Sequence, residues 1–114
     1  MKKRVVGLLA VVPLLLLGGR AYGQAASVRK ADKLFAAGGY FDAIAPYKDG
    51  LETVPAQLLG EYLFKIGECY RMTGNPQQAE VWYTKAIARD CKDARVHLYL
   101  GQALLQNEKY DLAR

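Results

Sequence analysis

Residues 60–91 read GEYLFKIGECYRMTGNPQQAEVWYTKAIARDC, and this stretch predicts two helices joined by a tight turn. Apolar residues recur three and four positions apart on each side of the turn, which is the spacing of one helix face. Gly74 suits the end of the first helix, because glycine readily takes the left-handed conformation found there. Asn75 and Pro76 suit the start of the second helix, as an N-cap and a first helical residue. With so short a connection, the two helices must fold back antiparallel.

Small residues in this unit are placed as regularly as the large ones. Gly67, Ala79 and Ala86 lie where the two helix backbones would approach closely. The pattern resembles the tetratricopeptide repeat, whose period is roughly 34 residues. The residues that carry the resemblance are Leu63, Ile66, Gly67, Tyr70, Gly74, Ala79, Tyr83 and Ala86. Cys91 replaces the usual closing proline, and Pro76 replaces the usual aromatic residue of the second helix. The resemblance implies an all-α fold of antiparallel helical hairpins, stacked as a right-handed α-solenoid.

The same pattern recurs on both sides, which predicts one helical domain over 24–114 with repeats at about 24–57, 58–93 and 94–114. In the first repeat, the two apolar faces are formed by Ala31, Leu34, Phe35, Tyr40, Ala43, Ile44, Tyr47 and Leu51. In the third, the recurring positions are held by His97, Leu100, Gly101, Leu104, Tyr110 and Ala113. The third repeat stops inside its expected second helix, which would leave an apolar side partly uncovered. We therefore expect the front part of a longer protein; the alternative is a short chain whose last residues fray.

Residues 1–23 have the features of an export signal. Three basic residues at 2–4 precede an apolar run over 5–17, and Ala-Tyr-Gly at 21–23 forms a small-x-small cleavage site. The apolar run is shorter than the ~20 residues that a helix needs to span a bilayer. We therefore favour cleavage near Gly23 over an uncleaved membrane anchor. We therefore expect an exported protein.

Removal of this segment changes the charge of the protein. The whole chain has 16 basic and 11 acidic residues and a net charge of +5. Four of the basic residues lie within 1–23, so the remainder has 12 basic against 11 acidic residues, or +1. No basic cluster remains that could make the many phosphate contacts of nucleic-acid binding. We expect no nucleic-acid partner, and contact with a membrane only through the signal or a partner.

No catalytic or metal-binding set stands out. His97, the only histidine, falls at a predicted core-facing position, and no serine or cysteine is spaced with it as a nucleophile would require. Export permits a disulfide, but the repeat places Cys69 and Cys91 farther apart than the ~7 Å limit between bridged α-carbons. Two buried thiols are therefore favoured over a bridge, and they complete no tetrahedral metal set. We expect no enzyme, no cofactor and no metal.

The remaining candidate is the concave face lined by the first helix of each hairpin. The candidate partner-binding residues, carried over from the repeat, are Asp32, Phe35, Glu61, Phe64, Lys65, Glu68, Arg71, Arg95, Leu98 and Tyr99. Phe64, Leu98 and Tyr99 lie off the core stripe among charged residues, as in a peptide-docking groove. The alternative is that a neighbouring repeat covers them. Acidic residues such as Asp32 and Glu68 are interpreted as solvated charges. The lysines and asparagines with which chaperone-binding repeats hold a terminal carboxylate are absent, so no carboxylate clamp is expected.

About residues 28–114 also resemble the amino-terminal repeats of OmpA-family envelope proteins from Bacteroidetes-type bacteria. The resemblance is carried by KADKLFAAGGYFDAIAPYKDGLE and FKIGECYRMTGNPQQAEVWYTKAI. In that family the repeats precede a propeller-like region and a peptidoglycan-binding domain, and members serve envelope assembly or type IX secretion. The resemblance implies a non-catalytic scaffold that lies in the periplasm, in association with the outer membrane, and docks envelope proteins or peptides. The alternative is a structural spacer or homo-oligomerisation module that positions such a carboxy-terminal domain. Neither later domain lies within this sequence, so no residue is assigned to peptidoglycan binding.

Overall fold

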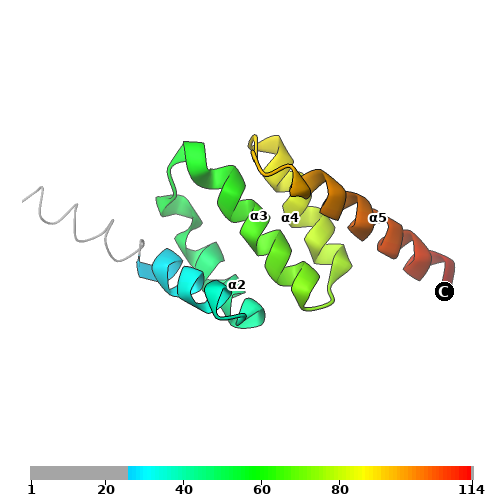
Figure 1. Ribbon diagram of the computed structural model, residues 1–114, viewed down its shortest axis with the longest axis horizontal. Helices are drawn as coiled ribbons and strands as arrows, with labels where there is room; N and C mark the ends of the chain where they lie inside the picture. Colours follow the sequence, from blue (N-terminus) through cyan, green and yellow to red (C-terminus); the bar gives the residue numbers. More distant parts are fainter. Residues whose placement is uncertain (1–25, 114) are drawn as a thin grey trace, which may run out of the picture.

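The structure, a computed structural model, describes residues 26–113 as a series of helices (Figure 1). The elements are a helix over 26–36, α2 (Tyr40–Gly50), the short 3-10 helix η1 (Leu51–Thr53), α3 (Ala56–Met72), α4 (Pro76–Ala88) and α5 (Arg95–Ala113). No strand occurs in this part of the chain, which confirms the all-α prediction for it. The predicted export signal and its cleavage site lie outside the described residues. Within 26–113, no helix is both long and apolar enough to span a bilayer.

The helices pack on one another in chain order. α2 contacts α3, α3 contacts α4 over the most extensive interface, and α4 contacts α5. Figure 1 shows successive helices side by side, with α5 at the outer end of the row. The order is that of stacked hairpins, in which α3 and α4 form the central pair.

The turns form as the sequence predicts. Gly74, between α3 and α4, has φ +74°, and Gly38, at the corresponding place in the first hairpin, has φ +82°. Glycine takes this left-handed conformation without the steric penalty of a Cβ. The Asn75 side chain then accepts a hydrogen bond of 3.2 Å from the backbone N–H of Gln78, and Pro76 begins α4. The cap satisfies one of the donors left unpaired at a helix start.

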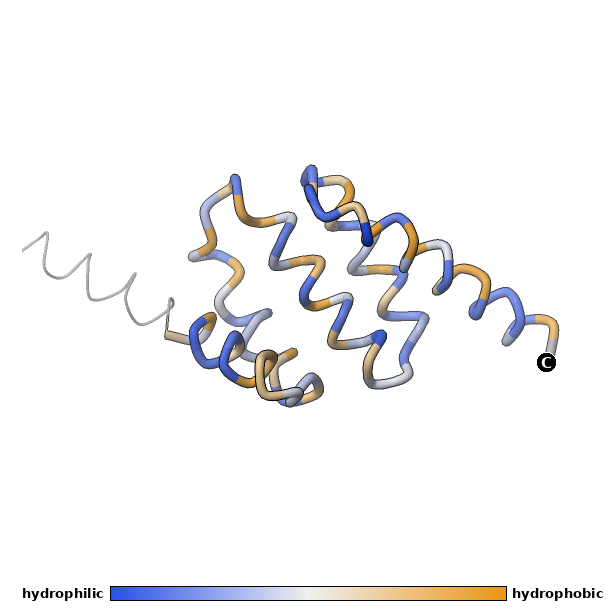
Figure 2. Tube along the Cα trace, viewed as in Figure 1, coloured by the Kyte–Doolittle hydropathy of each residue, from blue (hydrophilic) through white to orange (hydrophobic). Residues whose placement is uncertain are grey.

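The core lies between the helices and combines large and small side chains. Tyr47, Ile66 and Tyr83 are fully buried, and the small residues Ala79 and Ala86 pack beside them. In Figure 2, hydrophobic positions recur at helical spacing along each described helix. Full burial of one large apolar side chain contributes about 1.5–3 kcal/mol, so this core is the main source of stability.

Two glycines of α3 mark the closest approaches of the fold. A Cβ on Gly67 would lie 2.6 Å from ring atoms Cδ1 and Cε1 of Tyr83, which confirms the close packing predicted there. A Cβ on Gly60 would lie 2.7 Å from the carbonyl oxygen of Arg89 and 2.9 Å from the backbone nitrogen of Cys91. At Gly60 the obstructing atoms belong to the backbone, so a side-chain rotation cannot relieve the contact. The spacing of small residues predicted the close contact at Gly67, whereas no sequence signal pointed to the one at Gly60.

The third unit differs from the prediction in its helix boundaries. Tyr110 and Ala113 were expected on a second helix, but α5 continues unbroken from Arg95 to Ala113. Residues 107–109 read Asn-Glu-Lys and contain neither glycine nor proline, the residues that most often end a helix. The Asn107 side chain donates a hydrogen bond of 3.2 Å to the carbonyl oxygen of Pro76, the first residue of α4, so the later residues of α5 follow the point where α4 begins.

The buried side of α5 also differs from the prediction. Val96 and Ala103 are buried, whereas His97 is exposed instead of facing the core. Gly101 is exposed, and Leu104 retains 48% of its surface. Leu100 packs against the core as predicted and is partly buried, whereas His97, Gly101 and Leu104 are exposed on a side of α5 that no described helix covers. The expectation that the apolar side of this helix is partly uncovered is thus confirmed.

Both cysteines carry free thiols, as favoured over a bridge, although only Cys69 is fully buried and Cys91 is half-buried. Burial raises the pKa of the Cys69 thiol to about 12. Since the thiolate is the reactive form, we expect the thiol reagent DTNB at pH 8 to modify Cys91 first and Cys69 only in denaturant. Peptide mass spectrometry of wild type and Cys91→Ser measures this order. Equal native rates, or recovery of a bridged peptide, would contradict the structure.

Candidate functional site

The first group of predicted concave-face residues lies between the 26–36 helix and α3. Asp32 accepts hydrogen bonds from the Tyr47 hydroxyl at 2.6 Å and from Lys65 Nζ at 3.1 Å. The Lys65 ammonium also lies 4.8 Å from the centre of the Tyr62 ring and 6.0 Å from that of Phe35. The interpretation of Asp32 as a merely solvated charge is therefore wrong, because this carboxylate holds three elements together.

Asp32 stabilises the fold mainly through its hydrogen bond with the Tyr47 hydroxyl. Tyr47 is fully buried, and a buried hydroxyl without a partner is destabilising. Burial, and then the hydrogen bond to Asp32, raise the pKa of Tyr47 far above its ordinary value. The ion pair with Lys65 adds little, about 0–1 kcal/mol, because both side chains are about one-third exposed.

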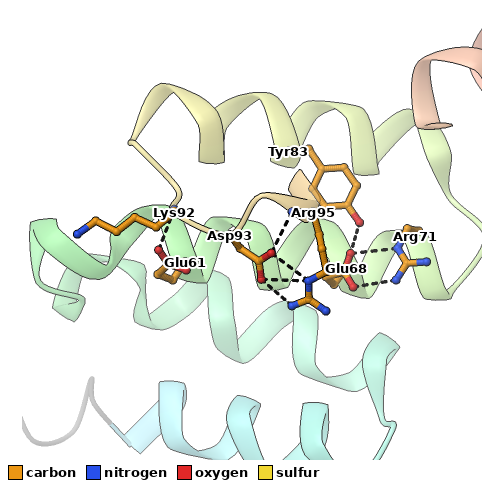
Figure 3. Close-up of polar contacts among 7 residues, drawn as sticks. All are labelled: Glu61, Glu68, Arg71, Tyr83, Lys92, Asp93 and Arg95. Atoms are coloured by element: carbon orange, nitrogen blue, oxygen red, sulfur yellow. Dashed lines mark hydrogen bonds and ion pairs between the residues drawn. The ribbon is translucent and has the colours of Figure 1, made fainter. Parts of the chain in front are cut away.

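The second group surrounds Glu68, on α3 (Figure 3). This carboxylate is only 8% exposed, which corrects its prediction as a solvated charge. It accepts hydrogen bonds from Arg71 Nε at 3.0 Å and Nη2 at 2.8 Å, and another from the Tyr83 hydroxyl. Several charged and neutral donors offset the cost of burying a carboxylate. Arg71 follows Glu68 by three residues, a spacing that can signal an ion pair, but no sequence signal identified the Tyr83 hydroxyl.

An aromatic and cationic layer joins α3 to α5. The Phe64 and Tyr99 rings stack 6.3 Å apart with an interplanar angle of 8°. The Arg71 guanidinium lies 4.0 Å from the Tyr99 ring centre, and that of Arg95 lies 5.5 Å from the Phe64 ring centre. Phe64 is 5% exposed, so its predicted exposure in a groove is wrong and the alternative of cover by the neighbouring repeat holds. Leu98, by contrast, is 58% exposed.

The connection between α4 and α5 is held by the remaining acidic residues. Asp93 accepts hydrogen bonds from the backbone nitrogen of Arg95 at 3.0 Å and from its Nη2 at 2.6 Å. Hydrogen bonds from Arg95 lower the pKa of the Asp93 carboxyl. Glu61 accepts a hydrogen bond of 3.1 Å from the backbone nitrogen of Lys92 (Figure 3). Glu61 is thus engaged with a loop, although it remains partly exposed on the predicted face.

The side chains of this face suit contacts with a peptide better than catalysis. The ion pairs of Arg71 and Arg95 use Nε and Nη2 of each guanidinium, and the second terminal nitrogen stands outside those pairs. Leu98, three residues after Arg95 on α5, offers an exposed apolar side chain. Guanidinium donors next to an apolar contact suit the carbonyl groups and side chains of a peptide. Within residues 26–113, no three His, Cys, Asp or Glu side chains are grouped to hold a metal.

The buried tyrosines predict the response of the fold to alkaline pH. Burial and the bond to Glu68 raise the pKa of Tyr83, and Tyr47 is raised in the same way by burial and Asp32. A raised pKa stabilises the fold fully below the unfolded value of about 10, and that stability is lost as pH rises above it.

We therefore expect the free energy of unfolding to fall above about pH 10, by up to ~1.4 kcal/mol per pH unit for each such tyrosine. Urea titrations between pH 8 and 11 measure this slope. Tyr83→Phe, the matched control, should show a shallower fall. An identical slope in wild type and Tyr83→Phe would show that Tyr83 ionises equally in both states.

One comparison with known proteins gives a match. Residues 60–93 match the family model of the tetratricopeptide repeat, which covers all but the start of α3, the whole of α4 and the loop towards α5. The match identifies a tetratricopeptide repeat in this stretch, and such repeats generally mediate protein–protein binding. It does not extend to the OmpA-family resemblance. No curated protein and no solved structure matches the chain.

Proposed function

We propose that this protein is a non-catalytic scaffold that docks a segment of a partner protein on the face formed by the 26–36 helix, α3 and α5. The observation that carries the proposal is Leu98, an exposed leucine that follows Arg95 by three residues on α5 and directly precedes Tyr99, the ring on which the Arg71 guanidinium lies. The repeat match over α3 and α4 supports the same role, since such repeats generally bind proteins.

The test places a photo-crosslinking residue at Leu98 in the cells that produce the protein. We expect one discrete crosslinked protein, and we expect Arg95→Glu, introduced beside it, to reduce that product at least tenfold. Arg89→Glu is the matched control, because it makes the same charge change at an exposed residue that lies beside Trp82 and Lys85. No discrete product, or equal loss in both variants, would refute docking on this face.

We place the partner in the bacterial envelope, in outer-membrane or type IX secretion assembly. The support is the signal-like sequence of residues 1–23 together with the resemblance of 28–114 to envelope repeats. Mass spectrometry of the cellular protein tests the location. A periplasmic product that begins near Gln24 is expected; an uncleaved product in the cytoplasm would contradict it.

A spacer or oligomerisation module is the second candidate, and one observation favours it. Phe64 and Tyr99 stack on each other, and each arginine of this face is paired with a carboxylate of the same chain. A face whose aromatic rings and arginines are already paired within the chain needs no ligand. The two functions differ in the crosslinking result, since a spacer would yield no product that depends on Arg95.

A further inference from the structure

A surface groove lies where η1, α3 and α4 meet, and it shares no lining residue with the proposed docking face. Figure 1 shows the connection from α2 to α3 and the end of α4 at the same edge of the molecule. The groove has a volume of about 480 Å³. Small-molecule sites usually have volumes of about 300–1,000 Å³, so this one has the size of a small ligand. We call it the Trp82 groove, after the aromatic residue that lines it.

The floor of the Trp82 groove is apolar. Leu63 and Trp82 are buried, and Leu51 and Leu59 are half-buried and pack against the same core. Ala88, on an exposed turn of α4, adds only a methyl group to the lining. An apolar chain laid on these side chains would be removed from water, which is favourable.

Two cations, Lys85 and Arg89, lie on the α4 side of this floor. They are four residues apart, so they occupy one face of the helix, and both are exposed. Neither forms an ion pair within residues 26–113, whereas the lysine and the two arginines of the docking face are each paired with a carboxylate. Cations in a last turn suit the negative end of a helix, but that role does not require an apolar groove beside them.

Trp82 connects the apolar floor with the cations. The ammonium groups of Lys85 and Lys48 lie 4.4 Å and 4.9 Å from the centre of its ring. Trp82 is 8% exposed, and its indole nitrogen Nε1 has no hydrogen-bond partner among the described residues. A buried indole N–H usually donates to an acceptor. A ligand with an anionic oxygen would bring an acceptor to this side of the ring, where the chain supplies none.

We propose that the Trp82 groove binds a fatty acid, with its acyl chain on the leucine floor and its carboxylate held by Lys85 and Arg89. The apolar floor is complementary to the chain, and the two cations are complementary to the head group. A partner protein suits the groove less well, because a stable protein interface buries about 800 Å² on each partner and would extend well beyond these residues. This site adds to the proposed docking role and does not depend on it.

The probe for this site is dodecanoate, kept below the concentration at which it forms micelles. Trp82 is the only tryptophan in the chain, so its fluorescence reports binding at the groove. We expect a saturable change in Trp82 emission with a Kd on the order of 0.1 mM, because a small ligand in an open groove binds weakly. Dodecyltrimethylammonium has the same chain with a cationic head, and acetate has the same head without the chain. Each should bind at least fivefold more weakly.

Three variants test the two halves of the groove. Lys85→Gln combined with Arg89→Gln removes both cations and should weaken dodecanoate binding about fivefold. Glu52→Gln removes the one carboxylate that lines the groove and should strengthen binding about twofold. Ala88→Phe fills the groove from an exposed position and should abolish binding. Circular dichroism reports whether each variant keeps the wild-type melting temperature.

The matched control is Lys30→Gln combined with Lys33→Gln, which makes the same charge change at exposed positions of the 26–36 helix and should leave binding unchanged. Absence of a saturable response to dodecanoate overturns the proposal, and so does equal binding of dodecyltrimethylammonium. Unchanged binding in the Lys85 and Arg89 variant has the same consequence. A response to phosphatidylglycerol vesicles without one to dodecanoate would replace the fatty acid with a membrane surface. None of these outcomes affects the crosslinking test at Leu98.

Discussion

Gly60→Ala is expected to lower the free energy of unfolding by about 2–3 kcal/mol, even though alanine is the better helix former. The added methyl group would lie 2.7 Å from the Arg89 carbonyl oxygen and 2.9 Å from the Cys91 nitrogen. Both obstacles are backbone atoms at the end of α4, so relief requires movement of the α3–α4 hairpin itself. Urea unfolding followed by circular dichroism at 222 nm measures the change.

Gly101→Ala is the matched control for Gly60→Ala. Both glycines lie within helices, but the space around Gly101 is open. The control should therefore gain stability by about 1 kcal/mol from helix propensity alone. A Gly60→Ala protein as stable as wild type, or stabilised like the control, would mean that α3 does not approach Cys91 as described.

The second large effect is expected at the buried carboxylate of Glu68. Glu68→Ala should lower the free energy of unfolding by about 3 kcal/mol, because the Tyr83 hydroxyl and Arg71 both lose their acceptor. Tyr83 is fully buried, so water cannot easily replace the carboxylate there. Glu108→Ala, on an exposed position of α5, is the control and should change stability by less than about 0.5 kcal/mol.

A double-mutant cycle separates this network from general helix effects. With Tyr83→Phe already present, removal of the Glu68 carboxylate should cost less than in wild type, because the hydroxyl is no longer left unpaired. Thermal and urea unfolding of the four proteins measure the coupling. Strict additivity of the two substitutions would contradict the hydrogen bond between Glu68 and Tyr83.

The central hairpin could be predicted from the sequence because its signals are local. Gly74 and Asn75 fix the turn through their own backbone and side-chain preferences, and the apolar spacing of α3 and α4 fixes their faces. Gly67 was recognised because the repeat requires a small residue there. Gly60 was not, since its contact with Cys91 depends on the path of a loop distant in sequence.

The candidate site was less predictable, because the charge or apolarity of a residue does not show which side chain of another helix it contacts. The sequence predicted Glu68 to be a surface charge, but in the structure it accepts a hydrogen bond from the Tyr83 hydroxyl. Phe64 was predicted to be exposed, but the Tyr99 ring stacks on it. The helix pattern in α5 correctly marks an apolar side around Leu104. It does not show whether a helix covers that side, and in the described chain none does.

The central claim, that α3 and α4 pack with a tyrosine ring against a glycine, is tested most directly by nuclear magnetic resonance. The Gly67 hydrogen that occupies the Cβ direction points at the Tyr83 ring. We expect strong nuclear Overhauser contacts between the Gly67 α-protons and the Tyr83 ring protons, with one α-proton shifted by the ring current. Their absence in the folded protein, with both residues assigned, would contradict the packing of α3 on α4 that forms the docking face.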